Sequence, residues 1–228
     1  MAHAPRTRPA VVAFDVVGTL FSLDPIAARM REAGLPDGRL TEWFARFLRD
    51  AFALDAAGGY VPFRQVAGGA LEVMLAEHGL PASSAATVLQ GFSELPPHSD
   101  VRPAFEQLRG AGIRVAALSN GAAETTRRLL ERAELATLVE RIISIDEVRR
   151  WKPHREVYLH AARVLDVTPT ALALVAAHAW DVLGAGRAGL TTGWVSREES
   201  AFQPAMGEPT VRGRTLTEVV EGLLALKT

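Results

Sequence analysis

Residues 11–20 read VVAFDVVGTL, an apolar run that ends at an acidic residue. The run favours a buried β-strand, so the Asp15 carboxylate emerges where that strand stops. Gly18 then allows a sharp turn, and the Thr19 hydroxyl can hydrogen-bond backbone within it. Because ligands of open α/β sheets bind at the carboxyl ends of the strands, we interpret Asp15 as a candidate nucleophile.

Further β-rich segments follow along the chain, at residues 113–118, 142–145, 172–176 and 191–195. Amphipathic helical patterns lie between them, at residues 122–133, 156–165 and 179–188. Strand and helix alternating at this spacing predict an α/β fold, in which helices cover both faces of a parallel sheet.

The segment that follows the first strand breaks this alternation. From about residue 23 to residue 94 the pattern is helical, with no convincing strand and with turns at glycine and proline. An insertion at this point lies over the carboxyl end of the first strand and forms a lid above Asp15. We therefore predict a discontinuous core of residues 1–22 and 95–228, with a helical cap of residues 23–94.

The composition is typical of a globular enzyme. The 228 residues are 48% hydrophobic and 22% charged, with a formal net charge of −1. This balance gives no electrostatic reason to expect nucleic acid or an anionic membrane as partner, and no apolar run reaches membrane-spanning length. The chain has no cysteine, which excludes disulfides, thiolate ligands and a cysteine nucleophile. With no signal-peptide pattern before the first strand, we expect a cytoplasmic enzyme.

Chemically active side chains follow four of the predicted strands, in the order Asp15, Ser119 with Asn120, Lys152 and Asp181. Taken singly, each has a structural explanation: a turn or helix cap for the acids and the serine, and a solvated surface position for the lysine. Their joint placement at one edge of a sheet instead favours an active site. The histidines lack the spacing of a metal site, so we predict no metal ligands.

The same strand ends resemble the motifs of a known family. The four strings are DVVGTL, SNG, KP and AWD, at residues 15–20, 119–121, 152–153 and 179–181. Together they resemble the haloacid dehalogenase superfamily, and most closely its type II 2-haloacid dehalogenase branch. The resemblance covers nearly the whole chain and implies a Rossmann-like core, a helical cap inserted after the first motif, and an aspartyl nucleophile.

Two positions differ from the phosphatases of this superfamily. Those enzymes carry a second aspartate where Val17 stands, and valine cannot protonate a leaving alcohol. They commonly hold Mg²⁺ with paired acids in the fourth motif, where Ala177 leaves only Asp181. Carbon–halogen cleavage needs neither group, because a halide leaves without a proton. We therefore expect hydrolysis of a small 2-haloacid to the 2-hydroxy acid, with no cofactor required.

The resemblance also implies a role for each motif. Asp15 attacks the carbon that bears the halogen, and water hydrolyses the resulting aspartyl ester. Lys152 keeps Asp15 ionised, since an opposite charge in contact lowers a carboxylate pKa by about 1–3. Asp181 orients Lys152 or the water, and Ser119 with nearby backbone N–H groups receives the substrate carboxylate. The other residues expected to bind substrate are Val16, Val17, Thr19, Phe44, Arg46, Asn120 and Trp180.

Three departures from the dehalogenase pattern leave substrate recognition open. Typical members have tyrosine at the position of Val17, and an arginine that engages halide and substrate at the position of Phe44. Arg46 and Arg49, on the same predicted helix, are candidates to replace that charge. The fourth motif usually begins Ser-Ser-Asn, whereas residues 176–178 are Ala-Ala-His.

The histidine in this motif has two explanations, and so do the nearby aromatic residues. The imidazole of His178 is next to the predicted nucleophile, where it can activate the hydrolytic water or hydrogen-bond a leaving group. Alternatively it caps the start of a helix or packs on Trp180. Trp43, Phe44, Phe47 and Trp180 fit either an apolar pocket wall or ordinary core packing. We count His178 among the candidate catalytic residues.

Two other functions are compatible with the sequence. One is a phosphatase or phosphonate hydrolase that holds Mg²⁺ on Asp15, the Val17 carbonyl and Asp181. The other is a non-catalytic member of the fold that binds a small carboxylate or a partner protein. For the leading hypothesis the partner is a small-molecule substrate, with no nucleic acid and no membrane, and the helical cap offers a surface for a homodimer.

Overall fold

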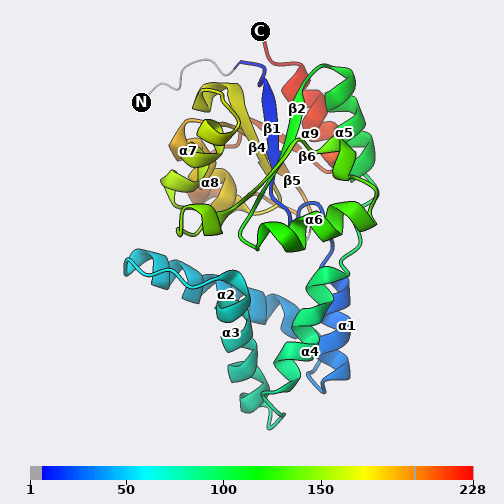
Figure 1. Cartoon of the computed structure of the whole chain (residues 1–228), viewed down its shortest axis with the longest axis vertical. Helices are drawn as coiled ribbons and strands as arrows, with labels where there is room; N and C mark the ends of the chain where they lie inside the picture. The colour runs from blue at the N-terminus through cyan, green and yellow to red at the C-terminus, as the bar shows by residue number, and fades with distance from the viewer. Residues whose placement is uncertain (1–6, 198, 228) are drawn as a thin grey trace.

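A parallel sheet forms the core of the protein. The computed structural model describes residues 7–197 and 199–227. Six strands lie in the order β3-β2-β1-β4-β5-β6, and every pair is parallel (Figure 1). The strands are β1 Val11–Phe14, β2 Arg114–Ser119, β3 Arg141–Ser144, β4 Leu172–Ala176, β5 Thr191–Val195 and β6 Val211–Gly213. The predicted α/β class is therefore confirmed.

The register of the sheet brings the motif residues to one edge. Phe14, the last residue of β1, is paired with Ala117 of β2 on one side and Val175 of β4 on the other. The backbone N–H of Asp15 continues this pattern and donates to the Val175 carbonyl at 3.0 Å. Asp15 thus leaves the sheet between the ends of its two neighbouring strands.

Helices cover both faces of the sheet, as the alternation predicts. On one face α5 (Val101–Gly110) packs against α9 (Leu216–Leu224), and on the other α7 (Arg155–Val164) packs against α8 (Ala179–Ala188) (Figure 1). The helix that follows β2, α6 (Ala123–Arg132), contacts β2 and β3. In the described part of the chain, no helix combines the length and apolar character that crossing a bilayer requires.

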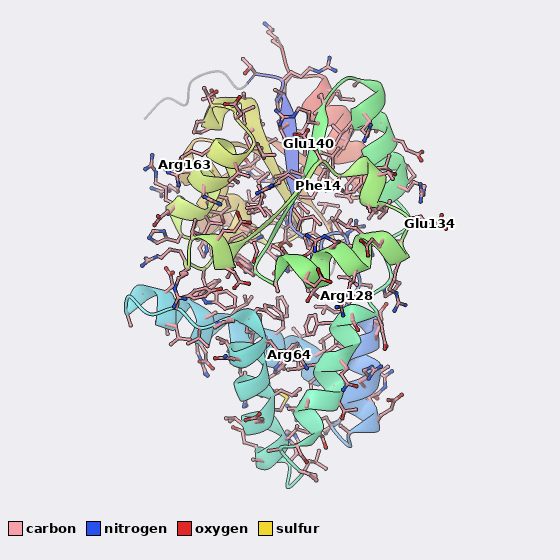
Figure 2. All side chains as sticks on the ribbon, viewed as in Figure 1. Phe14, Arg64, Arg128, Glu134, Glu140 and Arg163 are labelled. Carbon is pink, nitrogen blue, oxygen red and sulfur yellow. The ribbon has the colours of Figure 1, made fainter. Side chains whose placement is uncertain are left out.

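β1 lies inside the apolar interior of the protein. All four residues of this strand are buried, and the Phe14 ring lies 5.0 Å from that of Phe105 on α5 (Figure 2). A strand with two buried faces reads as a continuous apolar run, which explains why the sequence predicts it well.

Two strands differ in their bounds from the prediction, and one strand was not predicted, for physical reasons. β2 begins one residue later than expected and ends at Ser119, because the parallel ladder pairs Ser119 with Ser144 although both are polar. β3 correspondingly stops at Ser144, and Ile145 begins a single 3₁₀ turn. The three-residue edge strand β6 was not predicted, since Val-Arg-Gly carries no periodic apolar signal.

Four helices form the cap segment between β1 and α5. They are α1 Asp24–Glu32, α2 Arg39–Ala56, α3 Phe63–Glu77 and α4 Ser84–Gln90, and they lie at the end of the core where α6 runs (Figure 1). Trp43, Phe47 and Ala51 recur every four residues of α2 and are buried on the face that packs against α3.

The division into a cap of residues 23–94 and a core of residues 1–22 and 95–228 remains our proposal. In its favour, the described part of the segment 23–94 holds no strand of the sheet. Residues 1–6, 198 and 228 of the proposed core lie outside the described residues.

The cap is hydrogen-bonded to the core segment that precedes Lys152. Asp55, at the end of α2, accepts from the backbone N–H of Trp151 at 3.0 Å and pairs with the guanidinium of Arg150. The indole N–H of Trp151 donates to the Val61 carbonyl at 3.2 Å. We call these contacts of Asp55 and Trp151 the cap latch. They fix the cap to the chain one residue before Lys152.

Candidate active site

Asp15 is almost fully buried at the end of β1. The Thr19 hydroxyl donates to its Oδ2 at 2.6 Å and accepts from the backbone N–H of Ala177 at 2.9 Å. Gly18 has a φ of +81°, so the sharp turn expected after Asp15 is present. The carbonyl of Val16 accepts backbone N–H groups within this turn, and its side chain is buried. The turn therefore folds back to support the carboxylate.

Lys152 is the fully buried partner of Asp15. Its ammonium donates to Asp15 Oδ1 at 2.7 Å, to Asp181 Oδ2 at 2.7 Å and to the Leu118 carbonyl at 3.0 Å. All three protons of the ammonium are thus used, which fixes its position between the two acids. The structure brings together three of the four predicted catalytic residues through this one group.

Tyr158 completes this cluster and was not singled out from the sequence. Its hydroxyl donates to Asp181 Oδ1 at 2.6 Å, so both oxygens of that buried carboxylate have a donor. Tyr158 lies on α7, in the segment that follows Lys152; its place after the Lys-Pro motif was visible in the sequence, but no role was predicted for it. Gly184 of α8 permits this contact, since a Cβ there would lie 2.6 Å from the Tyr158 hydroxyl oxygen.

Charge balance determines the protonation of the cluster. Burial alone would raise the pKa of Asp15, but the charge of Lys152 and the hydrogen bonds from His178 and Lys152 hold that pKa well below its usual value. Burial lowers the pKa of Lys152 less than the two carboxylates raise it, so the net direction is upward. Burial and the charge of Asp15 raise the pKa of Asp181 despite Lys152. Asp15 is therefore held ionised beside Lys152.

His178 contacts the nucleophile and packs between aromatic rings at the same time. Its Nδ1 lies 3.1 Å from Asp15 Oδ2. Its ring stacks on Phe44 of the cap, with centroids 5.6 Å apart, and on Trp180 of the core at 5.1 Å. Burial would lower the pKa of His178, but the hydrogen bond and charge of Asp15 raise it above its ordinary value. The packing and the nucleophile contact, which the sequence left as alternatives, occur together.

Ser119 and Asn120 lie where β2 leads into α6. The Ser119 hydroxyl accepts the backbone N–H of Gly121 at 2.9 Å, and Asn120 Oδ1 accepts the backbone N–H of Lys152 at 3.3 Å. The carboxamide of Asn120 therefore keeps its NH₂ group for a ligand. Ala122, the residue that caps α6, offers no side-chain hydrogen bond, so backbone N–H groups at this helix start are available to an anion.

Two adjoining hollows lie between cap and core beside Asp15. The smaller, of about 20 Å³, is bounded by Asp15, Val17, Phe44, Phe47, Leu48, Phe63, Ser119, Asn120, Gly121, His178 and Trp180. The larger, of about 140 Å³, shares Val17, Phe63, Ser119 and Gly121 with it. Of the predicted substrate contacts, Val17, Phe44, Asn120 and Trp180 therefore lie at the smaller hollow, as does Ser119.

The prediction for Arg46 needs correction. Its guanidinium pairs with Glu42 and with Glu77 of α3, each at 2.6 Å, and it lines neither hollow. Arg49 is exposed and pairs with its neighbour Asp50. Both side chains lie on the outer face of α2, since Trp43 and its four-residue repeat occupy the inner face. Neither arginine replaces the missing positive charge.

Trp43 is a core residue of the cap rather than part of a pocket wall. It is fully buried, and its indole N–H donates to the Ala67 carbonyl at 3.0 Å. Phe47, one turn later, stacks on it and reaches the smaller hollow.

The donor set of the site does not fit Mg²⁺. The four carboxylate oxygens of Asp15 and Asp181 all accept hydrogen bonds from protein donors, and the Lys152 ammonium stands between the two acids. Mg²⁺ prefers near-octahedral oxygen ligands, and a cation here would meet the ammonium charge directly. Among the residues described, no group of three or more histidine or acidic side chains is arranged to hold a metal ion.

Known proteins match both the sequence and the structure. Residues 9–189 match the family of haloacid dehalogenase-like hydrolases. The (S)-2-haloacid dehalogenase 1 of Pseudomonas sp. (strain CBS-3) is 32% identical over 201 residues, which are 84% of this chain and 88% of that protein. A crystal structure of an L-2-haloacid dehalogenase has a TM-score of 0.89 at 27% identity, covering 96% of this chain and 100% of that one. The L-2-haloacid dehalogenase of Xanthobacter autotrophicus, solved with chloropropionic acid covalently bound, has a TM-score of 0.83 at 26% identity, covering 93% and 97%.

Proposed function

The chain belongs to the family of haloacid dehalogenase-like hydrolases, and we propose that it converts a small 2-haloacid to the 2-hydroxy acid through an ester on Asp15. The observation that carries this proposal is the position of Lys152. Its buried ammonium lies 2.7 Å from Asp15 and keeps that carboxylate charged. A charged carboxylate without a metal ion on it is a nucleophile for carbon. The similar Xanthobacter enzyme with chloropropionic acid covalently bound supports an ester intermediate.

In the first step an Asp15 oxygen attacks C2 of the substrate in line with the carbon–halogen bond. The oxygen supplies the electron pair of the new C–O bond, and the halide leaves with the electrons of the bond that breaks. No proton is transferred, so the valine at position 17 is sufficient. Asp15 loses its negative charge when the ester forms.

The ester then changes the state of His178. In the free enzyme the charge of Asp15 favours a protonated imidazole, and ester formation removes that charge. His178 then gives its proton to solvent and accepts one from a water molecule that adds to the ester carbonyl. The adduct collapses, the product alkoxide takes the remaining proton of that water, and Asp15 is restored as a carboxylate beside protonated His178.

Donors for the developing oxyanion are present on both sides of Asp15. Lys152 donates to Oδ1, and Thr19 donates to Oδ2 at 2.6 Å. Whichever oxygen forms the ester, the other becomes the carbonyl oxygen and retains a positioned donor. Such preorganised donors commonly contribute about 10²–10³-fold to the rate of acyl transfer.

Halide recognition in this proposal uses aromatic edges and one amide in place of an arginine. The smaller hollow of about 20 Å³ holds a single particle the size of a water molecule. Its walls include Phe44, Phe47 and Trp180, and aromatic ring edges carry positive charge. The free NH₂ of Asn120 and the protonated ring of His178 complete a cradle for an anion.

The substrate carboxylate is assigned to the start of α6. The first-turn backbone N–H groups of α6 have no side-chain cap, and the helix dipole favours an anion there. Ser119 supports the turn by accepting the Gly121 N–H at 2.9 Å. With the carboxylate here, C2 lies between α6 and Asp15.

A Mg²⁺-dependent phosphatase is the weaker alternative, because the Lys152 ammonium already stands between Asp15 and Asp181. A non-catalytic ligand-binding role is weaker still, since a strongly depressed carboxylate pKa beside a buried ammonium is typical of a functional site. A homodimer and a cytoplasmic location stay predictions from the sequence, and size-exclusion chromatography with light scattering tests the first.

The decisive experiment measures halide and phosphate release in parallel. Purified protein is incubated with haloacetates and 2-halopropionates and with generic phosphate esters, each with and without EDTA. We expect halide release that EDTA leaves unchanged, and its loss by roughly 10⁴-fold or more in Asp15→Asn. Phosphate release that disappears with EDTA and returns with Mg²⁺, without halide release, would overturn the proposal.

A further inference from the structure

The larger hollow next to Asp15 is an apolar cavity that the chemistry above does not use. It has a volume of about 140 Å³ and lies between the start of α3, the end of α4 and one face of α6. Its lining residues that do not touch the smaller hollow include Pro62, Leu89, Phe92, Thr125, Thr126 and Leu129. Leu89 and Phe92 are buried in the cap, and Leu129 is buried on α6. Packing on both sides therefore holds the cavity walls in place.

The position of this cavity determines which part of a substrate can enter it. Val17, Phe63, Ser119 and Gly121 border both hollows, so the cavity opens beside Asp15 and beside the start of α6. A substrate with its carboxylate at α6 and its halide in the smaller hollow has a hydrogen and one larger group left on C2. That group, the substituent, is directed at the apolar cavity.

From this geometry we propose that the cavity is a subsite for an uncharged apolar substituent on C2, an alkyl chain of about four carbons or a phenyl ring. The inference rests on the proposed function and names its substrate class. An apolar protein cavity of about 150 Å³ admits benzene, which sets the scale. The preferred substrates are therefore 2-halohexanoates and 2-halo-2-phenylacetates rather than haloacetates.

The outer end of the cavity limits the length of substituent that it can bind favourably. Arg64, at its rim, is exposed, and it makes no ion pair with any residue in the described part of the chain. Beyond it lies a more polar hollow of about 220 Å³ that Arg64 shares with Arg128 and Glu124 (Figure 2). A substituent long enough to leave the apolar walls reaches these charges and gains nothing further.

The first test is a chain-length series of halide release. Burial of one methylene corresponds to about 0.8 kcal/mol, or about fourfold in kcat/KM. We expect kcat/KM to rise at least tenfold from 2-bromopropionate to 2-bromohexanoate and then to level off at 2-bromooctanoate. A flat or falling series would overturn the subsite.

The second test fills the cavity from α6. Thr125 is half-buried on this helix, so a larger side chain there enters the cavity without disrupting the core. Thr125→Phe should lower the ratio of kcat/KM for 2-bromohexanoate over 2-bromopropionate by about tenfold. Thr125→Val removes the hydroxyl at constant volume and should keep the ratio. Equal ratios in the two variants would contradict the proposal.

A binding measurement separates the subsite from the reaction. Calorimetry with the unreactive acids propionate, hexanoate and phenylacetate needs no halogen chemistry. An affinity that rises from propionate to hexanoate, and that falls back in Thr125→Phe, supports the subsite. If no haloacid is turned over in spite of this, only the proposed function fails. Halide release without any length dependence in binding or turnover rejects the subsite alone.

Discussion

Lys152 neutralises two buried carboxylates, and its removal leaves them without a cation. In Lys152→Met we expect the free energy of unfolding near pH 7 to fall by about 3–5 kcal/mol, measured by urea denaturation. The pKa of Asp15 is held low in the folded state, so its pairing stabilises the protein above the unfolded value of about 3.9 and is lost as pH falls. Without the ammonium, burial raises the pKa of Asp15 in the variant, so its carboxyl takes up a proton near pH 4 and the deficit should shrink there. A deficit of equal size near pH 7 and near pH 4 would contradict the pairing of Lys152 with an ionised Asp15.

The charge state of His178 gives a second prediction. In His178→Asn we expect a burst of about one equivalent of halide followed by turnover slowed by about 10²-fold or more, because the ester forms but its water lacks a base. The measurement is rapid-quench halide release from a 2-haloacid. His160→Asn, at an exposed pair with Glu147, is the control and should keep the steady-state rate. A variant with no burst and no ester would place the imidazole in the first step instead.

The charge of His178 also affects the thermal stability of the protein, which can be measured without catalysis. The pKa of His178 is raised on folding, so its contact with Asp15 stabilises the protein below the unfolded value of about 6.5. That contribution is lost as pH rises through the higher folded value. The difference in melting temperature between the unaltered protein and His178→Asn should thus narrow from about pH 6 to about pH 9. A difference that widens would mean the imidazole is neutral in the folded state.

At this scale the sequence predicted the reacting groups better than their surroundings. Asp15, Lys152 and Asp181 follow strands, and parallel register alone brings strand ends together. Arg46 was misplaced because the two residues from Phe44 to Arg46 rotate the side chain by about 200° around α2, away from the hollow and toward Glu77. The Tyr158 contact depends on how closely two helices approach, which local pattern does not record.

Gly184 allows α8 to lie close to α7 and to the loop that carries Lys152. A Cβ at this position would lie 2.6 Å from Pro153 Cβ and from the Tyr158 hydroxyl oxygen. Gly184→Ala should cost about 1–3 kcal/mol in unfolding free energy and reduce kcat, because the helix that carries Asp181 must shift. Denaturation and halide release measure the two effects.

The control lies on the same helix. At Gly186 a Cβ would come no closer than 3.8 Å to Thr192, so Gly186→Ala fits, and we expect a gain of up to about 1 kcal/mol from helix propensity. Similar losses in both variants would mean that helix α8 tolerates no side chain on either face, and that the close approach at Gly184 is not special.

The helices and strands with a clear periodic pattern of apolar residues were predictable, whereas the edge strand of the sheet was not. β4, β5 and α8 have the predicted bounds, since buried strands and an amphipathic helix leave a clear pattern. β6 has three residues and gains its pairing from β5 rather than from its own composition. The helical character of the cap and its glycine and proline turns were visible in the sequence, but the bounds and the packing of its helices were not predicted.

For the molecule as a whole, the cap latch couples the lid to the reacting lysine. Asp55→Ala removes the acceptor for the Trp151 N–H, one residue before Lys152. We expect kcat/KM to fall about ten- to a hundredfold, because small displacements of a reacting group are costly, with limited proteolysis at the cap becoming faster. Asp50 lies on the same helix and, among the residues that the structure describes, pairs with exposed Arg49 alone, so Asp50→Ala is the control and should behave like the unaltered protein. Unchanged kinetics in Asp55→Ala would show that the latch is dispensable.

The stack of Phe44, His178 and Trp180 spans both parts of the molecule and gives it a built-in optical signal. The indole lies 5.1 Å from an imidazole whose charge follows the state of Asp15. Imidazolium quenches indole emission by contact, whereas neutral imidazole does so far less. Each turnover should consequently be visible as a transient brightening in stopped-flow fluorescence, which disappears in Trp180→Phe, with no dye or label attached.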